Sequence, residues 1–158
     1  MSRADVAPAD TERAVRIDLA AVRHNVGVLQ ERIRRPDGSR PLLTAVVKAD
    51  AYGHGAVAVA RAAAAAGADR LGVAHVREAL ALRAAGVRLP VLAWLHTGAT
   101  DFAAAVEAEV TLGVSGWDLD AVADAVRGLR ARGGAGPEAR AVLHLKADTG
   151  LGRHGCTP

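Results

Sequence analysis

The stretch Leu42-Leu43-Thr44-Ala45-Val46-Val47-Lys48-Ala49-Asp50-Ala51-Tyr52-Gly53-His54-Gly55 places a lysine at the end of an apolar run, just before a glycine-rich turn. A second stretch has the same form, Ala141-Val142-Leu143-His144-Leu145-Lys146-Ala147-Asp148-Thr149-Gly150-Leu151-Gly152-Arg153. Lys48 and Lys146 are the only lysines in the sequence, which otherwise uses arginine as its cation. An amine kept at the end of a buried strand favours chemistry that a guanidinium cannot perform. A desolvated lysine can lose its proton and attack a carbonyl, whereas arginine stays protonated.

Short apolar runs alternate with helix-like stretches from residue 41 onward. Strands are predicted over residues 42–47, 71–74, 91–95, 110–114 and 141–145, and helices over 56–66, 76–85, 102–108 and 119–132. Gly67, Gly86 and the cluster at 133–137 lie where these helices should end. Uniformly apolar strands separated by helices predict a parallel sheet. A repeat of about 20 to 25 residues is typical of a βα barrel or a doubly wound sheet.

The sequence outside this alternation divides the chain into three parts. Residues 1–12 are predicted to form a flexible N-terminus, and residues 13–40 a leading strand over 14–19 followed by a helix from 20 to about 34. Residues 41–158 are predicted to form a partial βα barrel. Five core strands are predicted, whereas a complete barrel has eight strands and ~250 residues. We therefore expect an α/β fold that is either an open sheet or an incomplete barrel.

Composition argues against several classes of function. The chain has 158 residues, enough for one domain, and its net charge of +3 comes from arginines interspersed with acidic residues, so nucleic-acid binding is not expected. Cys156 is the single cysteine, which rules out an internal disulfide and fits a reducing compartment. The first residues do not resemble a signal peptide, and no run approaches the ~20 apolar residues of a membrane helix. We expect a cytoplasmic protein without a membrane partner.

The residues that follow Lys48 point to a phosphorylated cofactor. Gly53 and Gly55 precede a predicted helix, and glycines before a helix N-terminus leave backbone N–H groups free for a phosphate. A reactive amine beside a phosphate site is what a pyridoxal phosphate enzyme requires. Without these neighbours, Lys48 is better explained as a surface lysine at a strand end.

The histidines give weaker signals. His54 is expected to belong to the loop, and His75 and His96 lie at strand ends but are each more often structural. His144 is expected to pack within its strand. The pair His154 and Cys156 does not predict a metal site.

Residues 45–55 resemble the cofactor-lysine signature of the alanine racemases, A-V-V-K-A-[ND]-A-Y-G-H-G. Residues 144–153 resemble their second signature, H-x-K-x-D-T-G-M-x-R, with Leu151 in place of the methionine. Residues 15–19 and 78–86 also resemble that family, so the resemblance covers nearly the whole chain. It implies an incomplete βα barrel of the alanine racemase N-terminal type, with about five of eight strands and without the C-terminal β domain. The leading strand would join that absent domain.

The resemblance also implies a cofactor and residue roles. Lys48 would bond pyridoxal phosphate and serve as the base on the D-alanine face, and Tyr52 would bind the cofactor phosphate. Lys146 matches a lysine that is often carbamylated in this family. Arg153 matches the arginine near the cofactor and the substrate carboxylate, which a guanidinium binds in a planar fork.

The implied reaction is the racemisation of L-alanine and D-alanine by proton transfer at Cα of the external aldimine, which supplies D-alanine for peptidoglycan. In the family the second base is a tyrosine from the β domain of the partner subunit in a homodimer. Because Tyr52 is the only tyrosine here, we expect this chain alone to be inactive. Two alternatives stay open, namely a non-catalytic pyridoxal phosphate-binding barrel fragment and a broader-specificity amino-acid racemase. The residues after Lys48 argue against decarboxylases.

Overall fold

Five parallel strands form one sheet in the order β1-β2-β3-β4-β5. The computed structural model describes residues 13–132 and 138–156, so the N-terminus predicted to be flexible and the glycine cluster at 133–137 lie outside the described residues. The strands are β1 (Thr44–Val46), β2 (Arg70–Val73), β3 (Val91–Ala93), β4 (Val110–Val114) and β5 (Leu143–Leu145). This confirms the predicted parallel βα fold. Because β1 and β5 are both edges, the sheet is not closed within the described residues.

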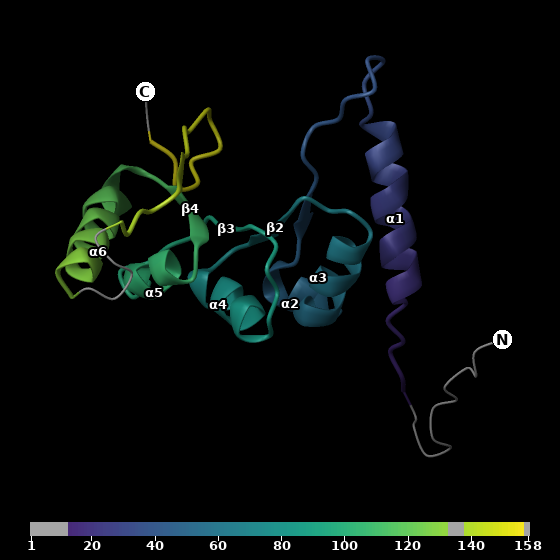
Figure 1. The fold of residues 1–158 in the computed structure, drawn as a ribbon, viewed down its shortest axis with the longest axis horizontal. Coiled ribbons are helices and arrows are strands. Elements are labelled where there is room, and N and C mark those ends of the chain that lie inside the picture. Colours follow the sequence, from purple (N-terminus) through teal and green to yellow (C-terminus); the bar gives the residue numbers. More distant parts are fainter. Residues whose placement is uncertain (1–12, 133–137, 157–158) are drawn as a thin grey trace.

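Helices connect the strands and lie along one side of the sheet, with α1 and α6 at opposite ends of the molecule (Figure 1). They are α1 (Leu19–Arg32), α2 (Lys48–Gly53), α3 (Ala56–Ala65), α4 (Val76–Ala84), α5 (Phe102–Glu107), the short 3-10 helix η1 (Gly116–Asp118) and α6 (Leu119–Arg132). The predicted α3 to α6 agree with these bounds to within a residue. Gly67 and Gly86 follow α3 and α4 with positive φ, as expected for glycines that end helices.

The core lies between the sheet and the helices. Leu71 and Val73 of β2 and Leu112 and Val114 of β4 point toward the helices and are fully buried. The helix residues that meet them are largely alanines, including Ala60, Ala79 and Ala105. Because alanine side chains are small, the helices can lie close to the sheet, and the core needs few aromatic residues.

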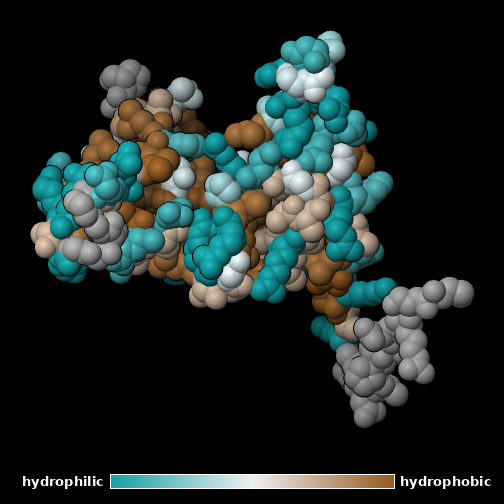
Figure 2. Space-filling view, in the orientation of Figure 1, coloured by the Kyte–Doolittle hydropathy of each residue, from teal (hydrophilic) through white to brown (hydrophobic). Residues whose placement is uncertain are grey.

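The outer side of β5 is exposed. Leu143 and Leu145 are in register with Leu112 and Val114, but 39% and 66% of their surface is exposed, because none of the described helices covers β5. The space-filling view shows apolar residues gathered over β4 and the C-terminal segment (Figure 2).

The face of the sheet opposite the helices carries Trp94, which follows β3. A Cβ atom on Gly72 would lie 2.8 Å from the Trp94 ring, and one on Gly113 would lie 3.0 Å from the Trp94 Cβ. Both neighbouring strands therefore use glycine where the tryptophan lies across them.

The leading strand predicted over residues 14–19 is not formed. Residues 13–18 have no strand pairing, and α1 begins at Leu19. The Asp18 carboxylate accepts hydrogen bonds from the N–H groups of Ala20 (2.8 Å) and Ala21 (3.1 Å), so Asp18 is a helix N-cap rather than a strand residue. A strand needs a neighbour to satisfy its backbone, and no described strand lies beside this segment. The prediction of a strand was therefore wrong for this structure.

Candidate functional site

Lys48 lies directly beyond the carboxyl end of β1. The N–H of Val47 donates to the carbonyl of Gly72 at 2.8 Å, so sheet pairing continues to the residue before the lysine. The chain then forms a left-handed turn, with φ between 52° and 56° at Ala49, Asp50, Ala51 and Tyr52. Non-glycine residues avoid this conformation, which costs ~1–2 kcal/mol per residue. The sequence predicted a loop here, and nothing in it signalled four consecutive left-handed residues.

The left-handed turn brings Lys48 and Tyr52 together. The Lys48 Nζ lies 5.5 Å from the centroid of the Tyr52 ring, and 60% of the tyrosine surface is exposed. Lys48 itself is half-buried. An amine and a phenol therefore share one solvent-facing position at the end of β1, as two residues of one site would.

The glycine-rich segment after the turn leads into α3 as predicted, but its first N–H is occupied. Gly55 has φ of 89° and is the N-cap of α3. The Asp50 carboxylate accepts a 2.7 Å hydrogen bond from the N–H of Ala56. His54 turns back onto the loop, with its Nδ1 2.8 Å from the carbonyl of Ala51, which agrees with its expected structural role.

Glu78 of α4 contacts this turn from a neighbouring βα unit. One carboxylate oxygen accepts the N–H of Ala49 at 2.6 Å, and the other accepts the N–H groups of Ala74 and His75, both at 2.9 Å. Burial raises the pKa of Glu78, but the three backbone donors more than offset burial, so the pKa lies below its usual value. No role was predicted for Glu78 from the sequence. Its position three residues after the helix N-cap was the available signal.

Lys146 lies at the carboxyl end of β5 and is anchored by its amine. Its backbone N–H donates to the carbonyl of Val114, and its Nζ donates to the carbonyl of Trp94, each at 2.8 Å. Burial lowers the pKa of Lys146 below that of an ordinary lysine. The nearby charge of Asp118 opposes this change, and that of Arg153 adds to it.

Arg153 is exposed on a loop that begins just after Lys146. The loop is closed at its base, where the N–H of Asp148 donates to the carbonyl of Cys156 (2.8 Å) and the N–H of Cys156 donates to the carbonyl of Lys146 (2.7 Å). The Asp148 carboxylate also accepts the N–H groups of Gly150 and Gly152, at 2.9 and 3.0 Å. Asp148 therefore organises the loop that carries Arg153.

A buried polar group lies near Lys146. His96, Ser115 and Asp118 are 3%, 3% and 1% exposed. The Asp118 carboxylate accepts the N–H of Ser115 at 2.7 Å, whereas neither His96 nitrogen has a hydrogen-bond partner within the described part of the chain. The His96 ring packs edge-on against Phe102, with 5.3 Å between ring centroids. Burial lowers the pKa of His96 and favours its neutral form.

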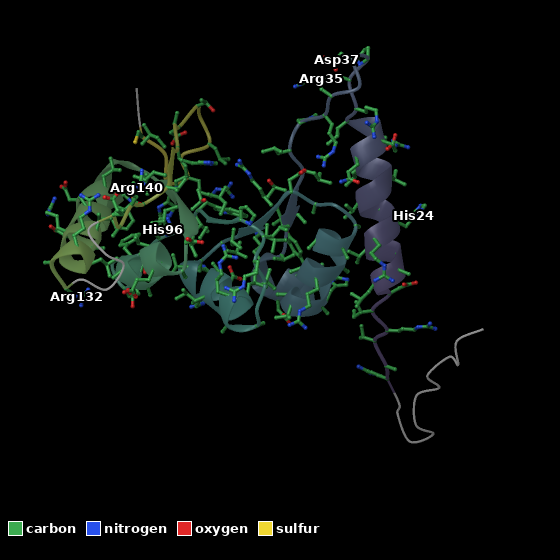
Figure 3. The ribbon with its side chains drawn as sticks, viewed as in Figure 1. His24, Arg35, Asp37, His96, Arg132 and Arg140 are labelled. Atoms are coloured by element: carbon green, nitrogen blue, oxygen red, sulfur yellow. The ribbon has the colours of Figure 1, made fainter. Side chains whose placement is uncertain are left out.

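The histidines differ in exposure. His96 lies inside the molecule, whereas His24 projects from α1 (Figure 3). His144 is exposed, so the prediction that it packs was wrong. It is exposed because β5 is an edge strand and the face of the sheet opposite the helices is open there. Among the described residues no group of three or more potential metal ligands occurs. None of the described helices is long and apolar enough to span a bilayer.

The predicted site residues fall into two pairs at the carboxyl edge of the sheet. Lys48 and Tyr52 follow β1, and Lys146 and Arg153 follow β5. Four strand spacings separate β1 from β5, which is ~19 Å along a flat sheet. In parallel βα folds, functional residues gather at this edge from several strands. The structure thus places the four residues at the expected edge, with one pair after each of the two edge strands.

Comparison with known proteins finds one family. The family model described as "Alanine racemase, N-terminal domain" matches residues 17–158. The chain is 50% identical over 143 residues to the alanine racemase of Mycobacterium ulcerans (strain Agy99), which covers 90% of this chain and 34% of the relative. It is 49% identical to that of Mycobacterium tuberculosis (strain ATCC 25618 / H37Rv), with the same coverage.

Comparison with solved structures finds the same family. The alanine racemase from D-cycloserine producing Streptomyces lavendulae matches with a TM-score of 0.79 and 48% identity, covering 90% of this chain and 34% of that one. The alanine racemase from E. faecalis matches with a TM-score of 0.73 and 34% identity, covering 89% of this chain and 35% of that one. The chain therefore spans about a third of the length of these relatives.

Proposed function

Since the chain belongs to the alanine racemase N-terminal domain family, we propose that it supplies the pyridoxal phosphate-binding part of an enzyme that interconverts L-alanine and D-alanine. The observation that carries the proposal is the placement of Lys48 and Tyr52 side by side at the carboxyl end of β1. That pair supplies an amine for a cofactor aldehyde and a hydroxyl donor for its phosphate.

The residues present fit the cofactor. Lys48 is a half-buried primary amine, reachable from solvent, and the exposed Tyr52 hydroxyl lies on the same side. When bound, pyridoxal phosphate supplies an electron sink that acidifies the Cα–H of an amino acid. Lys48 would take that proton and return it on one face, which is general base and general acid catalysis by a single amine.

Lys146 and Arg153, which follow β5, would orient the substrate. We propose that Arg153 binds the substrate carboxylate, because a guanidinium matches a carboxylate with two parallel hydrogen bonds. We also propose that Lys146 is carbamylated, which would turn its positive charge into a negative one and attract Arg153. Burial of Lys146 supports this modification, because its lowered pKa favours the neutral amine that reacts with carbon dioxide.

Racemisation needs an acid or base on both faces of Cα, and this chain offers only one. Tyr52 is the single tyrosine of the sequence and is assigned to the phosphate. We therefore propose that the 158-residue chain binds the cofactor but racemises alanine slowly or not at all. A homodimeric full-length enzyme, a cytoplasmic location and a role in peptidoglycan synthesis stay predictions. Non-catalytic cofactor binding is the second candidate function, and it is favoured by the same missing base.

Trapping of the cofactor tests the proposal. The purified chain would be mixed with pyridoxal phosphate and reduced with borohydride, and the modified lysine would be mapped by mass spectrometry. We expect the pyridoxyl group on Lys48, and its loss in Lys48→Arg but not in the matched control Lys146→Arg. Equal modification of both lysines, or none, would contradict the proposal. A coupled assay for D-alanine on the same sample separates the two candidate functions.

A further inference from the structure

We infer that Glu78 is the positioning residue for Lys48, because its carboxylate holds the left-handed turn that presents the amine. The geometric part of this inference stands on the structure alone. Its consequence for cofactor binding rests on the proposed function.

The two oxygens of Glu78 serve different partners. One accepts the N–H groups of Ala74 and His75 and thereby caps the N-terminus of α4, within its own βα unit. The other reaches across to the N–H of Ala49, the residue next to Lys48, at 2.6 Å. A residue needed only as a helix cap would use the first set of bonds. The bond to Ala49 therefore calls for a second explanation.

The turn needs such an anchor. Four consecutive non-glycine residues with φ between 52° and 56° persist only where surrounding contacts over-determine the backbone. Ala49 is the first of these four residues, so its N–H lies where the chain leaves the conformation of β1. From the next residue of the turn, the Asp50 carboxylate accepts a hydrogen bond from the N–H of Ala56 at the start of α3. Glu78 and Asp50 thus fix the turn to two different helices, and the turn fixes the direction of Lys48.

The charge of Glu78 matters for this role. A carboxylate accepts hydrogen bonds with both oxygens, whereas a neutral carboxyl group presents a donor at one of them. Charged groups around Glu78 include His75 on its own N-cap, Arg77 beside it on α4, and Asp50 and Lys48 on the facing turn. His75 lowers the pKa of Glu78 when charged, in the same direction as the three N–H donors. The anion is therefore the form that holds the turn.

The variant Glu78→Gln separates the two roles in the complete 158-residue chain. Glutamine keeps the size of the side chain but has one oxygen and one NH2 group. The single oxygen of glutamine can accept two hydrogen bonds if it faces Ala74 and His75, but only one if it faces Ala49. The first arrangement is therefore preferred, and it leaves the NH2 group facing the N–H of Ala49. The variant should keep the helix cap and lose the anchor of the turn. Glu107→Gln, at an exposed position of α5, is the matched control.

Two readouts are measured. The first is amide hydrogen exchange, which should accelerate by roughly ten- to a hundredfold at Ala49, the range expected for loss of a charged hydrogen bond, with little change at Ala74 and His75. The second is borohydride trapping of pyridoxal phosphate. The yield on Lys48 should fall by several-fold, the yield on Lys146 should not change, and Glu107→Gln should behave as the unmodified chain.

Each outcome decides the inference. Unchanged exchange at Ala49 in Glu78→Gln overturns it, and so does faster exchange at Ala49 with unchanged trapping at Lys48. If the unmodified chain traps no cofactor on Lys48, the proposed function fails, while exchange at Ala49 still tests the anchor.

A second measurement applies if Glu78→Gln does not fold. The amide NMR signal of Ala49 in the unmodified chain should then titrate with the Glu78 carboxyl, at a pH below the usual range for glutamate. An Ala49 signal that does not move across that range overturns the inference.

Discussion

Replacing Asp69 with asparagine tests how the amino ends of β1 and β2 are held in register. The Asp69 carboxylate forms a two-bond ion pair with Arg40, at 2.5 and 3.0 Å, and also accepts the N–H of Leu43 at 2.7 Å. The Asp69 N–H in turn donates to the carbonyl of Leu43 at 2.9 Å. One side chain thus ties the segment before β1 to the start of β2.

The magnitude follows from the charge of this pair. The Arg40 guanidinium, together with the N–H of Leu43, lowers the pKa of Asp69 from 3.8 to about 2. The difference of ~1.8 pH units corresponds to ~2.4 kcal/mol of stability at neutral pH. Because 27% of the Arg40 and 22% of the Asp69 side chain is exposed, water screens the pair. We therefore expect Asp69→Asn to lower the free energy of unfolding by about 1 to 1.5 kcal/mol.

The lowered pKa of Asp69 also predicts how its contribution to stability changes with pH. An aspartate with a lowered pKa in the folded state stabilises the protein above the pKa of the unfolded chain, and this contribution is lost as pH falls through the folded pKa. The difference between the unmodified chain and Asp69→Asn should be constant from neutral pH down to about 5 and then be lost progressively as the pH falls from about 5 to about 1. Urea unfolding followed by circular dichroism at several pH values measures this difference in the free energy of unfolding.

A second Arg–Asp pair provides the control. Asp124 and Arg127 also form an ion pair, but 71% and 69% of these side chains is exposed. We expect Asp124→Asn to cost no more than about 0.5 kcal/mol. Equal costs for the two variants, or a cost of Asp69→Asn that does not fall as the pH is lowered from about 5 to about 2, would refute the reasoning.

Three further predictions concern the loop, the core and the amine of β5. A Cβ atom on Gly155 would lie 2.6 Å from the backbone nitrogen of Asp148, so Gly155→Ala should open the loop and speed tryptic cleavage at Arg153 while the helical circular dichroism is kept. Leu82 is 1% exposed, and Leu82→Ala should cost ~2–5 kcal/mol in urea unfolding, against less than ~1.5 kcal/mol for Leu82→Met. Burial lowers the pKa of the unmodified Lys146 amine, so in buffer free of carbon dioxide its 13Cε signal should titrate below the usual lysine range, and a normal titration would contradict the buried amine.

The architecture was predictable because its signals are local. Apolar runs of strand length alternate with alanine-rich helical stretches, and Gly67 and Gly86 end two of the helices as expected. The same reasoning placed Lys48 and Lys146 at the carboxyl ends of their strands, where the structure has them. It failed at residues 14–19, because an alternating pattern does not form a strand without a neighbouring strand to pair with.

The sequence by itself determined the parallel βα order and the positions of the two lysines, since both depend on periodicity over a few neighbouring residues. Tertiary structure alone decided how those lysines are held. The left-handed turn after Lys48 is anchored by Glu78, 29 residues from Ala49, and the amine of Lys146 bonds the carbonyl of Trp94, 52 residues away. Such contacts join residues that no local pattern relates, because a backbone donor or acceptor is satisfied by whichever group folding brings within reach.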